Sequence, residues 1–399
     1  MTRELDLVLW GATGYTGRLV ARRLAVRAGD LRWGLAGRDP ARLRSVAQQL
    51  GVDVPLVRAD AEDAASMARL ARSTRVVLST VGPFARFGDA LVDACVEAGT
   101  HCCDITGEVP WVRAVIDRHH ERARERGLRL VSMCGYDSVP SDLGCLILQE
   151  DVYARHGRYA PSVEALAQPG KGGVSGGTIA SAAYLLERRG EPGVREHLTA
   201  RGALTPGFTP PVAPDPFDVA RVDGVWGGPF VMAGVNGRCV HRTHALLEHP
   251  WGEDFVYRER LWGGRGASGW LRAAGLLGAT AGLMAGMAWR PTRSFLRMFV
   301  LPSPGEGPSE ERRAAGSLRH HLVASDGARV LGRLRIEAAL DPGYAATAVF
   351  LTECGLATLA SNVETAGVLT PAYAFGSALR GRLEAGGFRF EFEPPARDS

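Results

Sequence analysis

The sequence feature that most constrains the fold is a glycine-rich turn that lies directly between an apolar run and a helical pattern. The apolar run Leu5–Trp10 predicts a buried strand. The turn Gly11-Ala-Thr-Gly-Tyr-Thr-Gly17 follows, and apolar residues then recur at helical spacing as far as Leu24. Glycines at these positions let the backbone turn tightly and approach a phosphate at the helix N-terminus. This order predicts a nucleotide-binding unit rather than a tight turn alone, and the expected contacts are Gly11, Thr13, Gly14, Tyr15, Thr16 and Gly17.

The alternation of strands and helices continues to about residue 135. Six strands that alternate with helices indicate a doubly wound parallel sheet, whose carboxyl ends face one ligand crevice. The apolar runs that predict the five further strands lie at 31–36, 55–58, 76–79, 101–104 and 129–133. Asp60 follows the third strand and is expected on the adenine side of a dinucleotide. The residues expected on the nicotinamide side follow the fourth strand and are Thr80, Val81, Gly82 and Pro83.

A basic residue at the end of the second strand selects between two dinucleotides. In NAD-preferring folds of this type, an acidic residue about 20 residues beyond the glycines holds the ribose 2′-hydroxyl. Here Arg38 stands at that place, and a guanidinium pairs with a 2′-phosphate. The sequence therefore favours NADP(H) over NAD(H), and a surface arginine at a helix start is the alternative. Asp39 is expected to cap that helix, with Pro40 at its first position.

Composition and spacing exclude several kinds of protein and of site. The formal net charge is only +4, so the chain lacks the basic excess that is typical of nucleic-acid binders. Lys171 is the only lysine, and Ala167 stands four residues before it, which excludes the Tyr-x-x-x-Lys pair of short-chain dehydrogenases. The histidines lack zinc-ligand spacing, and no metal site is predicted. Seven cysteines without paired spacing, and no secretory signal at the start, indicate free thiols in a cytoplasmic setting.

The periodicity of the sequence changes after Cys134, and we expect a domain boundary there. A second α+β domain would hold the substrate and the dimer contact, and a helical segment would return to the first domain. The expected boundaries are 1–135 for the dinucleotide-binding domain, 136–345 for the second domain and 346–399 for the C-terminal segment.

An uncharged apolar segment covers residues 273–289, with arginines on both sides. Gly278, Gly282 and Gly286 recur at every fourth residue, which gives one smooth helical face suited to close packing. The segment is short for a membrane span, which needs roughly 20 residues. Three interpretations stay open: a buried or dimer-interface helix, a helix on a membrane surface, and a span. The basic flanks suit an anionic leaflet.

Hydride transfer from a nicotinamide is the chemistry that remains, and it needs groups that polarise a carbonyl and deliver a proton. Tyr136 and Asp137 follow the sixth strand, at the edge where parallel sheets bind ligands. Ser175 belongs to a glycine-rich loop before another predicted helix. These three are the catalytic candidates, with Tyr136 as the preferred acid and a packing role for that tyrosine as the alternative. The helix after Asp137 is expected to begin at Asp142, with Ser141 as its cap.

Seven stretches, in order over nearly the whole chain, match the motifs of a known family. They are Gly11–Gly17, Ala36–Arg38, Ser79–Phe84, Gly107-Glu108, Gly135–Leu143, Val174–Gly177 and Gly367–Pro371. In these stretches the chain resembles the saccharopine dehydrogenase-like oxidoreductases, and within them the trans-acting enoyl reductases of actinobacterial lipid biosynthesis. The resemblance implies an NADP-binding Rossmann domain, a second α/β domain and a C-terminal helix that packs back on the first.

The resemblance also implies a reaction and a place in the cell. The reaction would be reduction of an enoyl group on a polyketide-derived lipid, such as a phthiocerol or phenolphthiocerol precursor, in trans for a polyketide synthase. The place would be the plasma membrane, which suits residues 273–289. Two other functions stay open: an imine or ketone reductase for a smaller metabolite, and a non-catalytic, lipid-associated protein that binds NADP. A homodimer is expected in each case.

Overall fold

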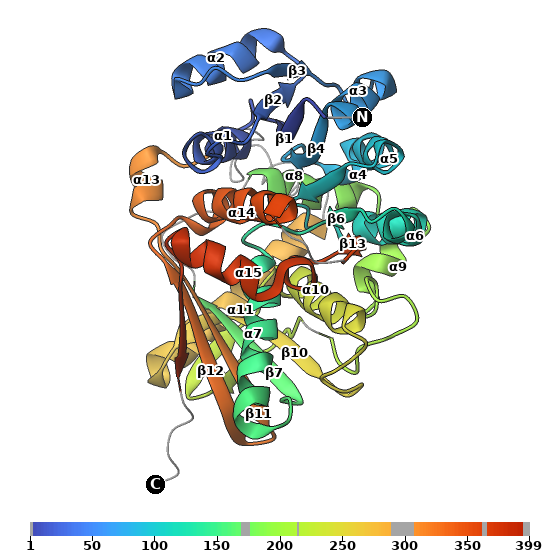
Figure 1. The fold of residues 1–399 in the computed structure, drawn as a ribbon. Coiled ribbons are helices and arrows are strands. Elements are labelled where there is room, and N and C mark those ends of the chain that lie inside the picture. Colours follow the sequence, from blue (N-terminus) through green and yellow to red (C-terminus); the bar gives the residue numbers. More distant parts are fainter. Residues whose placement is uncertain (1–2, 169–175, 214, 289–306, 361–364, 394–399) are drawn as a thin grey trace.

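Two seven-stranded sheets form the scaffold, and Figure 1 shows them at opposite ends of the molecule. The computed structural model describes residues 3–168, 176–213, 215–288, 307–360 and 365–393. The strands of the first sheet are all parallel, in the order β13-β6-β5-β4-β1-β2-β3. Their bounds are β1 Leu5–Trp10, β2 Trp33–Gly37, β3 Leu56–Arg58, β4 Thr74–Ser79, β5 His101–Asp104, β6 Arg129–Val131 and β13 Gly367–Leu369.

Helices cover both faces of the first sheet. Along β1, Leu7 and Leu9 join one apolar cluster, whereas Val8 and Trp10 join another, because successive side chains of a strand point to opposite faces. Burial on both sides explains why these strands are continuous apolar runs in the sequence. The helices that precede the second domain are α1 Tyr15–Arg27, α2 Pro40–Leu50, α3 Ala64–Ser73, α4 Phe84–Phe87, α5 Asp89–Ala98 and α6 Val109–Glu125.

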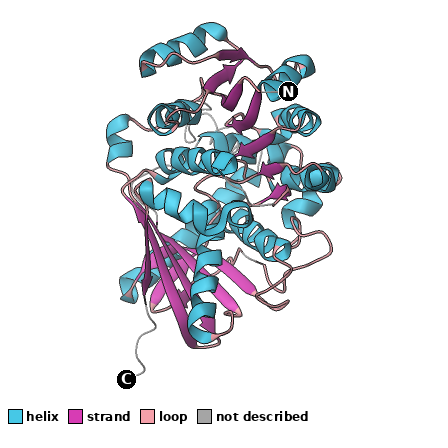
Figure 2. Ribbon diagram, viewed as in Figure 1, coloured by secondary structure: helices cyan, strands magenta, loops and turns pink. Residues whose placement is uncertain are grey.

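The second sheet is mixed and has the order β14-β12-β11-β7-β10-β9-β8, in which only β7 and β10 pair in parallel. Figure 2 shows its strands at the lower end of the molecule. The bounds are β7 Ser162–Gln168, β8 Ala220–Val222, β9 Val225–Gly228, β10 Val256–Gly264, β11 Leu318–Asp326, β12 Arg329–Ala338 and β14 Arg389–Glu393. The pair β11–β12 is the hairpin of a strongly alternating sequence.

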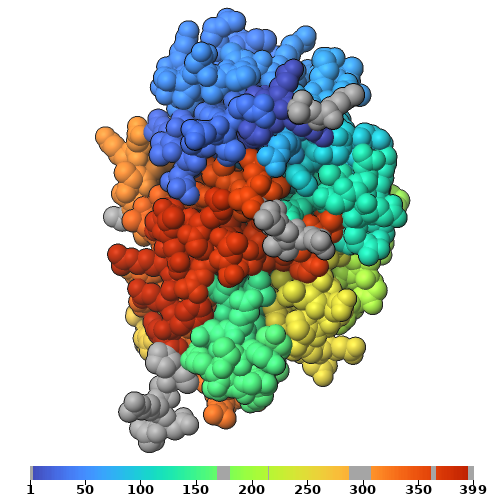
Figure 3. All heavy atoms as spheres, in the orientation of Figure 1, coloured from blue at the N-terminus to red at the C-terminus, as the bar shows by residue number. Residues whose placement is uncertain are grey.

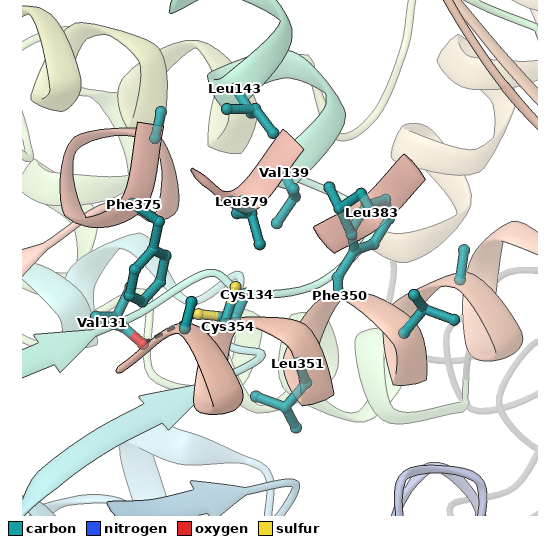
Figure 4. Packing of buried hydrophobic residues seen from close by; sticks show 14 of the residues in the cluster. Val131, Cys134, Val139, Leu143, Phe350, Leu351, Cys354, Phe375, Leu379 and Leu383 are labelled. Atoms are coloured by element: carbon teal, nitrogen blue, oxygen red, sulfur yellow. Dashed lines mark hydrogen bonds between the residues drawn. The ribbon is translucent and has the colours of Figure 1, made fainter. Parts of the chain in front are cut away.

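The helices of the second half connect the two sheets. Their bounds are α7 Val139–His156, α8 Gly176–Glu187, α9 Val194–Thr199, α10 Ala233–Leu246, α11 Gly266–Ala288, α13 Glu310–Ala314, the π-helical turn Pro342–Ala346, α14 Thr347–Ala360 and α15 Pro371–Ala385. In Figure 3 the C-terminal residues lie between the N-terminal residues and α7. Figure 4 shows side chains of β6, α7, α14 and α15 meeting in one apolar cluster. The core therefore continues from one sheet to the other.

A buried ion cluster fixes α14 against the first domain. Glu353 is fully buried, and its carboxylate pairs with the guanidinium groups of Arg23 at 3.3 Å, Arg27 at 2.9 Å and Arg382 at 3.4 Å. These arginines come from α1 and α15. The carboxylate is thus the meeting point of three helices.

Three expectations about the C-terminal half need correction or detail. The segment 346–399 does pack a helix, α14, on the first sheet, but it also contributes β13 to that sheet and β14 to the second. The helix expected from Asp142 begins at Val139, and Ser138 rather than Ser141 is its cap residue. Among the described residues, Pro342–Ala360 is the one stretch with the length and composition of a membrane span, and 78% of it is buried inside the protein.

Candidate functional site

A pocket of about 410 Å³ lies at the carboxyl edge of the first sheet. All twelve residues that the sequence predicts as dinucleotide contacts line this pocket: Gly11, Thr13, Gly14, Tyr15, Thr16, Gly17, Arg38, Asp60, Thr80, Val81, Gly82 and Pro83. The sequence reasoning missed six further lining residues, which are Trp10, Gly37, Ala61, Phe87, Ala180 and Tyr344. The first three of these are neighbours of predicted residues and follow from adjacency, whereas Phe87 lies four residues beyond Pro83. Ala180 and Tyr344 come from the second half of the chain, where no local signal marks them.

The glycines of the turn are required by close backbone contacts. Gly11 has φ +90°, and a Cβ atom there would lie 2.6 Å from the Thr80 hydroxyl oxygen. A Cβ atom on Gly17 would lie 2.0 Å from the carbonyl oxygen of Gly11. Thr80 also ties the turn to β4, because its backbone N–H donates to the Trp10 carbonyl at 3.1 Å. Only glycine therefore allows α1 to start this close to β1.

The strand order assigns the two ends of the pocket. The order reverses between β1 and β4, which is the switch point where doubly wound sheets bind dinucleotides. Arg38 and Asp60 stand beyond β2 and β3, on the adenosine side. Arg38 is exposed, and Asp39 caps α2 by accepting hydrogen bonds from the next two free N–H groups of the backbone, as the sequence predicts.

The opposite end of the pocket is formed by residues 80–83, which follow β4, and by Phe87. The Gly82–Pro83 peptide is cis. Ala180 of α8 and Tyr344 bring the second half of the chain to the same pocket. The pocket is therefore lined by both halves of the molecule, whereas Arg38 and Asp60 of the adenosine side belong to the first domain.

Tyr15 of the glycine turn is held by the segment that precedes β11. Its hydroxyl donates to the Pro308 carbonyl and accepts from Arg313, and its ring meets Tyr344 edge-on at 4.6 Å between centroids. The neighbouring pair Arg22–Glu310, at 3.0 Å, adds a contact between α1 and α13. Tyr15 is thus held at the pocket by residues that lie far from it in the sequence.

These features fit NADP(H). The glycine turn leaves backbone N–H groups free to meet a pyrophosphate at the start of α1. The Arg38 guanidinium supplies the cation that a 2′-phosphate needs. The crevice at the switch point has room for a ligand that extends to both sides of β1.

Tyr136 and Asp137 lie beside this pocket but do not line it. Both are half-buried, and the backbone N–H of Tyr136 donates to the Thr347 hydroxyl at 3.1 Å. Thr347 is one turn beyond Tyr344, which does line the pocket. The predicted catalytic pair is therefore adjacent to the pocket wall on the side of the second domain.

The turn that carries this pair is strained and anchored. Met133 has φ +65°, which is rare for a residue other than glycine, and such strain persists where the surroundings impose it. Asp104, at the end of β5, accepts a hydrogen bond from the Ser132 hydroxyl at 2.9 Å and from the Thr106 N–H at 2.9 Å. Burial raises the pKa of Asp104 to about 6. The chain after β6 is thereby turned toward the second domain.

Burial also changes the acidity of the candidate pair. It raises the pKa of Asp137 to about 6 and raises the pKa of Tyr136 well above its usual value. A carboxyl group with a pKa near 6 carries a proton in part of the population near neutral pH, as a general acid requires. The tyrosine stays a neutral hydrogen-bond donor over the same range.

A buried polar network supports the start of α7 from behind. The Ser141 hydroxyl donates to the Glu259 carboxylate at 3.1 Å and lies 3.4 Å from His320 Nε2. This bond explains why Ser141 does not cap the helix. Burial raises the pKa of Glu259 to about 7 and lowers that of His320 to about 3, so both groups favour their neutral forms. In the part of the chain that the structure describes, no group of three or more His, Cys, Asp or Glu residues is suited to a metal ion.

The third catalytic candidate, Ser175, and the only lysine, Lys171, lie outside the described residues. The helix that follows them, α8, is described from Gly176 onward. The roles of the predicted site residues stay predictions, although twelve of them share one pocket and two more lie beside it.

Comparisons with known proteins place the chain in a family. Residues 7–131 match the family described as the saccharopine dehydrogenase NADP binding domain. A Mycobacterium tuberculosis (strain H37Rv) protein named as a trans-acting enoyl reductase is 38% identical over 408 residues, which are 96% of each chain. The trans-acting enoyl reductase of Mycobacterium ulcerans is 36% identical over 410 residues, also 96% of each chain.

A solved structure supports the fold. The apo form of saccharopine dehydrogenase (L-Glu forming) from Saccharomyces cerevisiae matches with a TM-score of 0.54 and covers 98% of this chain and 100% of that one. At 13% identity this likeness concerns the fold alone. The domain match identifies the cofactor as NADP(H), in agreement with Arg38 and the glycine turn. The chain is an NADP-dependent oxidoreductase, and it belongs to the trans-acting enoyl reductases within the saccharopine dehydrogenase-like family.

Proposed function

We propose that the protein is an NADPH-dependent enoyl reductase that acts in trans on an intermediate of a polyketide synthase. The substrate class is a polyketide-derived or long-chain lipid of the phthiocerol or phenolphthiocerol kind. The observation that carries this proposal is the extent of the identity, 38% over 96% of the chain. It includes the second domain, and not merely the dinucleotide-binding domain that many oxidoreductases share.

The bound cofactor would supply a hydride, and the protein would supply position and charge. Residues 11–17 would hold the pyrophosphate, and Arg38 the 2′-phosphate. Residues 80–83 would lie along the nicotinamide. Reduction of a conjugated double bond also needs a proton for the α-carbon and a donor for the carbonyl oxygen.

Tyr136, Asp137 and Ser175 are the groups proposed for these two tasks. The acidities described above favour Asp137 as the proton donor and Tyr136 as the hydrogen-bond donor to the carbonyl, which reverses the preference drawn from the sequence. Asp137 has the pKa nearest to neutral pH, and general acids are most effective there. Ser175, which comes directly before α8 in the sequence, is proposed to orient the substrate.

The test follows NADPH oxidation with a panel of trans-2-enoyl thioesters of increasing chain length. Each is offered on coenzyme A and on an acyl carrier protein. Turnover that rises with chain length supports a lipid enoyl reductase. Turnover confined to small imines or ketones overturns it in favour of a reductase of small metabolites. NADPH binding without turnover of either panel indicates a non-catalytic protein.

We also propose that the protein works in the cytoplasm at the inner face of the plasma membrane, through α11. Its apolar side chains Trp270, Leu271, Leu283 and Met284 are 47%, 64%, 42% and 62% exposed. Such a helix suits the boundary between head groups and acyl chains. Trp289, the last residue of the predicted segment 273–289, lies outside the described residues.

Flotation with phosphatidylglycerol vesicles tests this location. Met284→Glu should abolish flotation, whereas Val26→Glu, on an even more exposed apolar residue of α1, should not. Sedimentation velocity on the same variants tests the homodimer that we propose for the second domain. The wild type could instead fail to float while Met284→Glu converts a dimer to a monomer. That pair of results would assign α11 to the dimer contact.

A further inference from the structure

Glu108 is a buried carboxylate that the proposed chemistry does not use. It is 1% exposed and directly precedes α6. Its two oxygens accept hydrogen bonds from the Phe84 N–H at 2.7 Å and the Ala85 N–H at 2.8 Å. The Ser181 hydroxyl donates a third bond at 2.6 Å. Three short hydrogen bonds thus converge on one buried carboxyl group, and hydrogen bonds to a carboxylate are stronger than those between neutral groups.

The three donors belong to two separate parts of the nicotinamide side. Phe84 and Ala85 begin α4, directly after residues 80–83, and Phe87 of the same helix lines the pocket. Ser181 lies on α8 next to Ala180, which lines the pocket from the second domain. One carboxylate therefore joins the two walls that enclose this end of the pocket.

Glu108 is itself fixed from the first sheet. Its backbone N–H donates to the Thr106 hydroxyl at 3.1 Å, and the Thr106 N–H donates to Asp104 at 2.9 Å. Asp104 ends β5 and also accepts a hydrogen bond from Ser132, the residue directly before Met133 with its positive φ. The end of β5 thus fixes the position of Glu108, and Glu108 in turn fixes α4 and α8 at the pocket.

We propose that Glu108 is a positioning residue for the nicotinamide, and that Ser181 docks α8 against it to close that end of the pocket. The adenosine side has no contact to α8 among the described lining residues, so it stays open to the cofactor whether or not α8 is docked. Docking would restrict the nicotinamide ring and exclude water from it. This inference rests on NADP(H) binding and not on the identity of the proposed enoyl substrate.

The test removes the cross-domain bond and leaves the other two intact. Ser181→Ala is compared with Ser181→Thr, which keeps the hydroxyl, and with Ser45→Ala on the exposed surface of α2. Two probes are titrated: NADPH, and adenosine 2′,5′-bisphosphate, which has only the adenosine half. The anisotropy of bound NADPH fluorescence reports the freedom of the nicotinamide.

Ser181→Ala is expected to weaken NADPH roughly five- to tenfold, as the loss of one charge-assisted hydrogen bond implies. Its affinity for the bisphosphate should equal that of the wild type, and the fluorescence anisotropy at saturation should fall. Ser181→Thr should restore both. Amide exchange at Phe84 and Ala85 should be unchanged in Ser181→Ala but faster in Glu108→Gln, because the new amide NH₂ group cannot accept.

Equal weakening of both probes by Ser181→Ala would show general damage and would overturn the proposal. So would a variant that is indistinguishable from Ser45→Ala. None of these readouts uses an enoyl substrate. Failure of the turnover panel with the expected binding results would therefore count against the enoyl reductase proposal alone.

Discussion

The two sheets have the same number of strands but differ in how the sequence reveals them. The first sheet is parallel and buried on both faces, so six of its seven strands are short apolar runs that can be recognised one by one. The second is mixed, and it carries ion pairs such as Arg319–Glu337 between β11 and β12 at 2.9 Å and Arg333 of β12 with Asp223 of the β8–β9 turn at 2.6 Å. Its strand order depends on pairings between distant segments. The difference shows that the turns at the dinucleotide pocket come from short local segments, whereas the second sheet is assembled from strands spread from β7 to β14.

The largest effect should come from the most local feature of the first sheet. Gly17→Ala would place a Cβ atom 2.0 Å from the Gly11 carbonyl oxygen, a contact that neither backbone segment can relieve. We expect NADPH affinity to fall more than about 100-fold, since the turn can no longer present its N–H groups. Fluorescence titration measures this loss. Gly381→Ala on α15, where a Cβ atom meets nothing within 4 Å, is the control and should bind normally.

The junction between the two sheets should respond next. Glu353→Ala removes the carboxylate from three arginines and leaves their charges partly buried, and such losses cost about 3–5 kcal/mol of unfolding free energy. Urea unfolding at equilibrium measures the change. Glu310→Ala breaks the exposed pair with Arg22 and should change the free energy of unfolding by less than about 1 kcal/mol. Equal effects would mean that the buried cluster does not hold α14.

The pH dependence of kcat tests the proposed proton donor, Asp137. If Asp137 donates the proton, its protonated form is the active one, so kcat should fall as pH rises through about 6. Asp137→Asn should lower kcat by roughly 100-fold and flatten this limb, since the amide cannot supply the proton. NADPH affinity should stay the same. An unchanged limb in the variant would assign the titration to another group, with Glu259 the nearest candidate.

The smallest expected effect is a change in the preference for NADPH over NADH. Arg38→Ala removes the cation offered to the 2′-phosphate, so NADPH should bind about 10- to 50-fold more weakly and NADH equally well. Parallel titrations with both dinucleotides give the ratio directly. Arg42→Ala, at an exposed arginine in the first turn of α2, is the matched control. A loss shared by both dinucleotides would show that Arg38 acts on the turn and not on the phosphate.

The contrast between local and distant segments also decides which site residues could be predicted from the sequence. Residues 11–17 and 80–83 could be predicted because each set directly follows an apolar run that marks the end of a strand. Ala180 and Tyr344 could not, since they reach the pocket only through the packing of α8 and of the π-helical turn Pro342–Ala346. Ser141 was expected to cap a helix because its residue type suits a cap, but a buried carboxylate, Glu259, takes its hydroxyl instead.

The seventh strand, β13, was missed for a different reason. It is only three residues long, and it lies directly before helix α15 without an alternating pattern of its own. Its place in the sheet is set by pairing with β6. β14 is a similar case, since its pairing with β12 decides its sheet.

The late position of β13 has a consequence for synthesis of the chain on the ribosome. Its partner β6 ends roughly 240 residues earlier, and at roughly 5–20 residues per second the two are made about 10–50 s apart. During that interval β6 presents an unpaired edge, and unpaired edges invite pairing with other chains. β12 waits in the same way for β14, although for less time. A nascent chain of this protein is therefore expected to need protection of two strand edges until its last helices and strands have emerged.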